Sequence, residues 1–100
     1  MVELRLSAAA MNDLDDIQET GIERFGPIAA ADFLTGFDRK FGLLRDHSRA
    51  GQVRPEFRQD MRVLPHRPYH ILYHLLPETV LIVRIIHQRR DVRRALGEHA

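Results

Sequence analysis

The sequence predicts an α+β fold in the order β-α-α-β-β-β, with a helical hairpin packed on one face of a small, mainly antiparallel sheet. Two observations carry this prediction. Apolar residues recur every three or four positions through residues 8–44, as in amphipathic helices, and they alternate or run together through residues 61–86, as in strands. The 100 residues are also the length of one domain, 1–100, that can bury a core of its own.

The N-terminal half predicts one strand and two helices. Apolar and charged side chains alternate over residues 2–6, which is typical of a strand. Ser7 is placed to cap a first helix that Gly26 ends, and Pro27 begins a second helix where its missing N–H costs nothing. Each helix has one apolar face, so we expect an antiparallel hairpin. These faces contain Leu14, Ile17, Gly21 and Phe25 in the first helix, and Ala30, Phe33, Leu34, Phe37, Phe41 and Leu44 in the second.

The C-terminal half predicts three further strands after a polar loop over residues 46–60. Residues 61–66 form the first of these, and residues 69–76 alternate in polarity as the second. Residues 79–86 are apolar on both faces apart from Arg84, which is typical of a strand covered on both sides. Two residues separate the last two strands, so we expect them to pair as a hairpin.

The alternation in the last strand divides its apolar residues between two faces. We expect one face to join the helices in a single core made of Leu14, Ile17, Phe33, Phe37, Phe41, Ile71, Tyr73, Leu81 and Val83. The opposite face would then expose Val80, Ile82 and Ile86. An exposed apolar patch on a small domain indicates a partner that covers it.

Positive charge is concentrated near the C-terminus, although the net charge is only +1. Residues 1–46 hold nine acidic and five basic side chains, whereas residues 47–100 hold five acidic and ten basic ones. Fourteen of the fifteen basic residues are Arg, which favours planar contacts with carboxylates or phosphates. We therefore predict an anion-binding surface after the last strand. Its residues are Arg84, His87, Arg89, Arg90, Arg93 and Arg94.

Several classes of function are disfavoured by the composition. Without cysteine the chain has no disulfide, thiol nucleophile or thiolate ligand. His70 and His74 lie about 13 Å apart along a strand, too far to share one zinc ion, so neither a metal nor a cofactor is expected. No apolar run approaches the ~20 residues of a membrane span, and we expect a soluble, cytoplasmic protein.

The ordered set of short motifs resembles a known family. The helical half contributes DLDDI at residues 13–17, RFG at residues 24–26 and the segment Phe41 to Leu44. The strands contribute MRVLP, YHILYHLL and VLIVRIIHQRRD. Together these resemble the ParE toxins of the ParE/RelE superfamily of type II toxin-antitoxin systems over nearly the whole chain.

The resemblance implies a binding function. ParE toxins are associated with plasmid stabilisation and inhibit DNA gyrase, and a cognate ParD-like, DNA-binding antitoxin wraps round them. It implies gyrase as the target of the arginine-rich surface and an antitoxin as the partner of Val80, Ile82 and Ile86. Direct binding of nucleic acid is not expected.

Two alternatives remain within the superfamily. RelE toxins cleave messenger RNA on the ribosome, which needs an acid, a base and positive charge at the phosphate. The residues that would supply these are His87, Arg58, Arg62 and Arg89, and we expect them to converge with Arg90 at the end of the sheet. The chain has no Lys after Lys40 and no Tyr after Tyr73, and it has His70 where RNA-cleaving members often have Arg. An inactive member retained only as a complex partner is the third interpretation.

Overall fold

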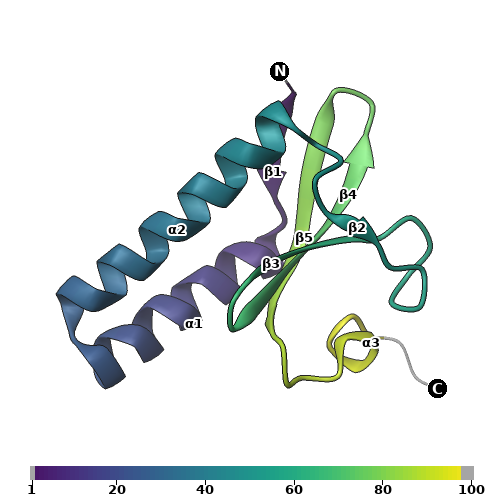
Figure 1. The fold of residues 1–100 in the computed structure, drawn as a ribbon. Coiled ribbons are helices and arrows are strands. Elements are labelled where there is room, and N and C mark those ends of the chain that lie inside the picture. The colour runs from purple at the N-terminus through teal and green to yellow at the C-terminus, as the bar shows by residue number, and fades with distance from the viewer. Residues whose placement is uncertain (1, 98–100) are drawn as a thin grey trace.

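The protein consists of a five-stranded sheet with a helical hairpin on one face and a short C-terminal helix on the other (Figure 1). The computed structural model describes residues 2–97. Its elements are β1 (Glu3–Leu6), α1 (Ala8–Phe25), α2 (Pro27–Asp46), β2 (Gln52–Val53), β3 (Arg62–His66), β4 (Tyr69–Leu76), β5 (Thr79–His87) and α3 (Val92–Ala95). The α+β class, the helical hairpin and the four predicted strands are confirmed, whereas β2 and α3 are missing from the prediction.

The sheet has the strand order β1-β5-β4-β3-β2. Three neighbouring pairs are antiparallel, and only β1 runs parallel to its neighbour β5. β1 pairs with β5 only as far as Ile82, so the last part of β5 has no neighbouring strand on that side. The start of α1 covers this edge, where Ser7 N–H donates to the Ile82 carbonyl at 2.9 Å and the Ser7 hydroxyl donates to the Val83 carbonyl at 2.7 Å.

Local sequence signals set the helix ends as predicted. Ser7 caps α1, where its hydroxyl accepts a hydrogen bond from the Ala10 N–H at 3.0 Å. Gly26 separates the two helices with a φ of 85°, a left-handed conformation that glycine adopts without a steric cost, and Pro27 is the first residue of α2.

The main core lies between the helical hairpin and the sheet. Phe37, which is 1% exposed, is at its centre and packs against Phe33, Phe41 and the half-buried ring of His66. The buried members of this core are Ala10, Ile17, Phe37, Phe41, Leu44, Leu64, Ile71, Tyr73, Val80, Ile82 and Ile85. Seven of the nine residues predicted for the core contribute to it, and Leu81 and Val83 do not.

A bulge in β5 explains the error for Leu81 and Val83. Leu72 pairs with Arg84 and Tyr73 pairs with Ile82, so Val83 is an extra residue in the ladder. Val80 and Ile82 face the helices before the bulge, and Ile85 does so after it. Because β5 is apolar on both faces, alternation alone could not assign the faces.

A second core covers the other face of the sheet, so the predicted exposed patch does not exist. Ile86 is 1% exposed and packs with Met61, Val63, Leu72 and Val92, beneath α3 and the segment before β3. Val80 and Ile82 are completely buried under the hairpin. The expectation that Val80, Ile82 and Ile86 lie exposed for an antitoxin is therefore wrong.

One tyrosine fixes the loop between α2 and β3. The buried Tyr73 hydroxyl donates to the Ser48 carbonyl at 2.9 Å and accepts from the Gly51 N–H at 2.8 Å. A side chain at Gly51 would begin 2.7 Å from this hydroxyl and 2.9 Å from the Val63 carbonyl, so only glycine fits. Burial raises the pKa of Tyr73, which keeps the hydroxyl protonated and able to donate.

We expect Phe37→Ala to lower the free energy of unfolding by about 3–5 kcal/mol, because it leaves a cavity at the centre of the main core. Phe25→Ala is the matched control, since this ring is 73% exposed and its loss should cost about 0.5 kcal/mol or less. Urea unfolding followed by circular dichroism measures both. Equal losses for the two variants would contradict this account of the core.

Candidate functional site

The candidate site lies at the end of the sheet where β4 begins and β5 finishes. Tyr69 pairs with His87 across these strands, and their rings meet edge to face with centroids 5.4 Å apart. The half-buried His87 accepts a hydrogen bond at Nδ1 from the Arg89 N–H at 3.1 Å. In the neutral ring the hydrogen is therefore on Nε2, which leaves Nε2–H as a donor to a ligand.

An arginine cluster follows directly after His87. We give this name to Arg89, Arg90, Arg93 and Arg94, all of which have exposed side chains. Arg89 and Arg90 lie in the turn after β5, and the other two lie in α3, whose start is capped by the Asp91 carboxylate. The exposed part of the predicted anion-binding surface thus lies on one short stretch of chain at the end of a strand.

Arg84, which was assigned to that surface, is engaged inside the molecule. Its guanidinium makes a two-pronged contact with the Asp13 carboxylate of α1, with N to O distances of 2.7 and 2.9 Å. It also donates to the Ala95 carbonyl of α3 at 2.8 Å. The pKa of Arg84 is raised by the hydrogen bonds to Asp13, so the guanidinium stays charged. Arg84 therefore lies apart from the exposed arginines, since its guanidinium bonds to Asp13 of α1 and to the Ala95 carbonyl of α3.

Asp13 also completes the backbone bonding of the sheet edge. Its Oδ2 accepts from the Ile85 N–H at 2.9 Å, at the part of β5 that has no neighbouring strand. Asp13 is the buried charged residue among those the structure describes, and its two oxygens are satisfied by one guanidinium and one amide. A sequence pattern gives no sign of such a contact, because 71 positions separate Asp13 from Arg84.

The structure brings together only some of the residues proposed for ribonuclease chemistry, since Arg62 lies apart from the contact between His87 and Arg89. Arg58 donates to the Leu96 carbonyl at 3.2 Å, next to α3. Arg62 donates to the Gly51 carbonyl at 2.7 Å and lies four residues from His66 along β3, about 13 Å from the end of the sheet that holds His87. The predicted convergence is wrong for Arg62, because β3 holds it away from the end of the sheet at which His87 and Arg89 are in contact.

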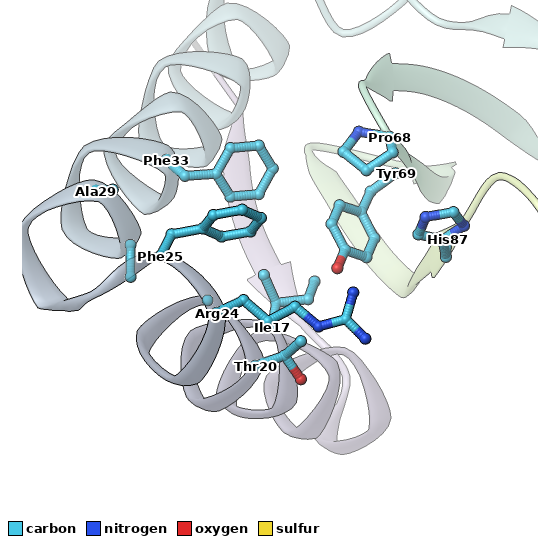
Figure 2. A pocket seen from close by; sticks show the side chains of 11 residues that line it. Ile17, Thr20, Arg24, Phe25, Ala29, Phe33, Pro68, Tyr69 and His87 are labelled. Atoms are coloured by element: carbon cyan, nitrogen blue, oxygen red, sulfur yellow. The ribbon is translucent and has the colours of Figure 1, made fainter.

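A pocket of about 420 Å³ lies between the tip of the helical hairpin and this end of the sheet (Figure 2). We call it the tip pocket. It is lined by Ile17, Thr20, Gly21, Arg24, Phe25, Ala29, Ala30, Phe33, Pro68, Tyr69 and His87. The helical spacing predicted Phe25 in the core and indicated no role for Arg24, although the RFG motif marks the hairpin tip that holds both.

A second pocket lies on the sheet beside β2 and contains a histidine with an unusual environment. It is lined by Ala50, Gln52, Arg54, Val63, Pro65 and His70. The His70 Nδ1 is buried and has no hydrogen-bond partner among the described residues. Burial lowers the pKa of His70, and the positive charges of Arg54 and Arg67 act in the same direction. His70 is therefore a neutral imidazole near pH 7.

Residues 2–97 contain neither a candidate metal site nor a helix that could span a membrane. The described chain contains no group of three or more acidic or histidine side chains arranged to hold a metal ion. Over the same residues, neither long helix is apolar enough to cross a membrane.

The fold defines a structural class: a small α+β domain that is shared with solved structures of toxin-antitoxin systems. The structure resembles that of the chromosomal ParDE toxin-antitoxin system from P. aeruginosa, with a TM-score of 0.76, 22% identity, and 87% of this chain and 96% of that chain covered. It also resembles the RelBE2 toxin-antitoxin complex from Mycobacterium tuberculosis, with a TM-score of 0.53, 21% identity, and coverage of 86% and 96%.

Sequence comparison narrows the class to one family. The sequence profile of the ParE toxin of the type II toxin-antitoxin system parDE matches residues 4–92. Toxin ParE1 of Caulobacter vibrioides is 30% identical over 97 residues, which are 97% of this chain and all of that protein. Toxin ParE1 of M. tuberculosis is 30% identical over 92 residues, or 91% of this chain and 94% of that protein. The chain belongs to the ParE toxin family, as the resemblance in its motifs indicated.

We expect Asp13→Ala to lower the free energy of unfolding by about 2–4 kcal/mol. The change leaves the Arg84 charge and the Ile85 N–H without their acceptor, and the loss stays below that of a fully buried pair because Arg84 keeps some exposure. Asp15→Ala is the control, because Asp15 is exposed on the same helix. Chemical denaturation measures both, and a loss for Asp13→Ala no larger than that of the control would contradict the structural role.

We expect His70 to make the protein less stable in mild acid. The unfolded chain binds a proton at His70 with the ordinary pKa of 6.5, whereas the folded chain binds it only at lower pH. The unfolded state therefore takes up more protons between the two pKa values, and the stabilisation that is present above 6.5 is lost as the pH falls through that range.

Denaturation curves over a pH series test this linkage. In His70→Gln the free energy of unfolding should fall less steeply as the pH drops below the ordinary histidine pKa of 6.5, because the variant has no imidazole to protonate. Asn12→Gln, at an exposed position of α1 that carries no titrating group, should leave the slope as in the wild type. An unchanged slope in His70→Gln would show that His70 is not responsible.

Proposed function

We propose that this ParE-family protein inhibits DNA gyrase by binding it, and that a cognate ParD-like, DNA-binding antitoxin neutralises it in the cytoplasm. The relatives named above are toxins, and both similar structures come from toxin-antitoxin systems. A toxin that acts by binding requires a rigid surface with one dominant kind of charge. Unlike a ribonuclease, it does not require a general acid and a general base at one phosphate.

The arginine cluster is the observation that carries this proposal. Four exposed guanidinium groups follow one strand end within six residues, in a chain whose net charge is only +1. Such a concentration attracts acidic protein surfaces and accelerates association with them. β5 supports the cluster rigidly, because it is the inner strand next to β4 and its outer edge is bonded to α1.

The arrangement of the candidate catalytic residues favours binding over RNA cleavage. Cleavage by the RelE-type mechanism needs charge, acid and base around one phosphate. Arg62 instead donates to the Gly51 carbonyl, away from the end of the sheet that holds His87, and Arg58 donates to the Leu96 carbonyl. The target-binding role is therefore assigned to His87, Arg89, Arg90, Arg93 and Arg94.

One observation keeps messenger RNA cleavage as a second candidate function. His70 lies in a pocket with Gln52 and Arg54, and its lowered pKa gives a neutral imidazole that can accept a proton at neutral pH. A ribonuclease of this chain would use His70 and Arg54 on the sheet. The set Arg58, Arg62, His87 and Arg89 is the less favoured alternative, because Arg62 lies apart from His87.

We expect the double charge reversal Arg89→Glu/Arg90→Glu to abolish inhibition of gyrase supercoiling by the purified protein, because it replaces the attracting charge by repulsion. The control is Arg39→Glu/Arg45→Glu, which makes the same change in net charge at two exposed positions of α2. His87→Gln should leave inhibition within about threefold of the wild type, because glutamine keeps a hydrogen-bond donor and no proton transfer is required.

The same preparations, incubated with translating ribosomes, distinguish the two functions. Cleavage of ribosome-bound messenger RNA that falls by about 10²–10⁴-fold in His70→Gln or His87→Gln would replace gyrase inhibition by ribonuclease activity. A wild-type protein that neither inhibits gyrase nor cleaves RNA would indicate an inactive member of the family.

A further inference from the structure

The C-terminal helix α3 carries half of the arginine cluster but makes few bonds of its own. Arg93 and Arg94 lie in this helix, which has only four residues. Its internal bonds include those from the N–H groups of Ala95 and Leu96 to the carbonyls one turn earlier. A helix this short is unstable in isolation, because so few bonds do not offset the free energy needed to start a helix. The positions of Arg93 and Arg94 therefore depend on the contacts that the rest of the chain makes with α3.

Two arginines from other elements bond the C-terminal end of α3. Arg84 of β5 donates to the Ala95 carbonyl at 2.8 Å, and Arg58 of the segment before β3 donates to the Leu96 carbonyl at 3.2 Å. The last carbonyls of a helix have no partner within the helix, so these guanidinium groups satisfy them. Hydrogen bonds from a charged donor are also stronger than those between neutral groups. α3 is thus held by its end as well as by the packing of Val92 into the second core.

The bulge in β5 directs Arg84 toward α3. Ile82 and Ile85 both face the helical hairpin, and Val83 between them packs against the second core. The extra residue therefore lets Val83 and Arg84 lie in succession on the α3 side of the sheet. Under strict alternation Arg84 would share the side of Ile82, and its charge would point into the main core. Bulges next to functional sites commonly redirect a side chain in this way.

Asp13 fixes the orientation of the Arg84 guanidinium. Its two oxygens accept from Nε and Nη2 of Arg84 at 2.7 and 2.9 Å, which leaves Nη1 as the donor to the Ala95 carbonyl. A planar group with several donors can hold a carboxylate with one edge and a carbonyl with another. The pair is mostly shielded from water, since 19% of the Arg84 side chain and 11% of the Asp13 side chain are exposed. The bond to α3 therefore comes from a donor that is held in place.

We propose that Arg84 is a positioning residue of the target-binding surface. Held by Asp13, it fixes the end of α3 and so sets where Arg93 and Arg94 stand relative to the rest of the arginine cluster. Arg84 acts through α3 and does not itself contact the target. This inference rests on the proposed function, because that function assigns the arginine cluster to the target. It adds to the exposed arginines a half-buried one that keeps them in place.

Arg84→Lys separates the bond to α3 from the charge. Lysine keeps the positive charge beside Asp13, but its single nitrogen cannot occupy the three donor positions of the guanidinium. NMR relaxation should then show the backbone order parameters of α3 falling from about 0.85 toward about 0.6, with those of β5 unchanged. Arg39→Lys, at an exposed position of α2, is the matched control and should leave α3 as in the wild type.

Inhibition of gyrase supercoiling is the functional measurement. Arg84→Lys should need about ten times the wild-type concentration for half-inhibition, because two of the four clustered arginines must then be ordered when the target binds. Phe41→Leu is the control for stability, since it removes buried volume from the main core on the other face of the sheet. This variant should be less stable but should keep both the order of α3 and the inhibition of the wild type.

Asp13→Asn tests the same inference if Arg84→Lys does not fold. The amide oxygen of asparagine can still accept from the Ile85 N–H, but the uncharged side chain no longer offers two acceptor oxygens to the guanidinium. The order of α3 and the inhibition of gyrase should therefore decrease together in this variant as well.

Four results would overturn the proposal. Unchanged order of α3 in Arg84→Lys would show that the bond to Ala95 does not hold the helix. Loss of that order with full inhibition would show that the target does not depend on the position of α3. Loss of inhibition with an ordered α3 would make Arg84 a direct contact of the target. An equal loss of inhibition in Phe41→Leu would reduce the effect to stability. A wild-type protein that does not inhibit gyrase would contradict the proposed function alone, because the order of α3 is measured without a target.

Discussion

The contact between Asp13 and Arg84 connects the three layers of this small protein. The carboxylate belongs to α1, the guanidinium to β5, and the same guanidinium bonds a carbonyl of α3. Asp13 also supplies the acceptor for a backbone amide at the edge of β5 that no strand covers. Charges removed from water are tolerated only when every donor and acceptor is satisfied, and here one carboxylate and one guanidinium satisfy each other and two backbone groups. The position of the arginine cluster relative to the hairpin depends on this contact.

Much of the fold could be predicted because its signals are local. Ser7, Gly26 and Pro27 set the helix ends, and the alternation of polarity identified four strands. The faces of β5 could not be predicted, because it is apolar on both sides and the extra residue at Val83 exchanges its faces midway. β2 has two residues and α3 has four, which are too few for a periodic pattern to emerge.

The candidate site was predictable only where its residues are close in sequence. The arginine cluster was found because it occupies one short stretch, and its exposure agrees with that interpretation. The internal contacts of Arg84 could not be predicted, because its partner Asp13 comes from the other half of the chain. The tip pocket was missed for a related reason: Arg24 and Phe25 meet Tyr69 and His87 only after the hairpin has packed on the sheet. A residue that the sequence pattern assigns to the buried face of a helix can thus form the exposed wall of a pocket.

The bulge in β5 decides which side of the sheet the end of this strand faces. If β5 alternated strictly through Val83, the residues after Val83 would exchange the two sides of the sheet. Ile85 would leave the main core, Ile86 would leave the second core, and the amide that Asp13 bonds would point elsewhere. Removing Val83 would instead leave a regular ladder in which Tyr73 and Leu72 keep their partners Ile82 and Arg84, and every later residue of β5 would keep its side. The bulge is therefore one extra residue that β5 accommodates locally, and both cores depend on that accommodation.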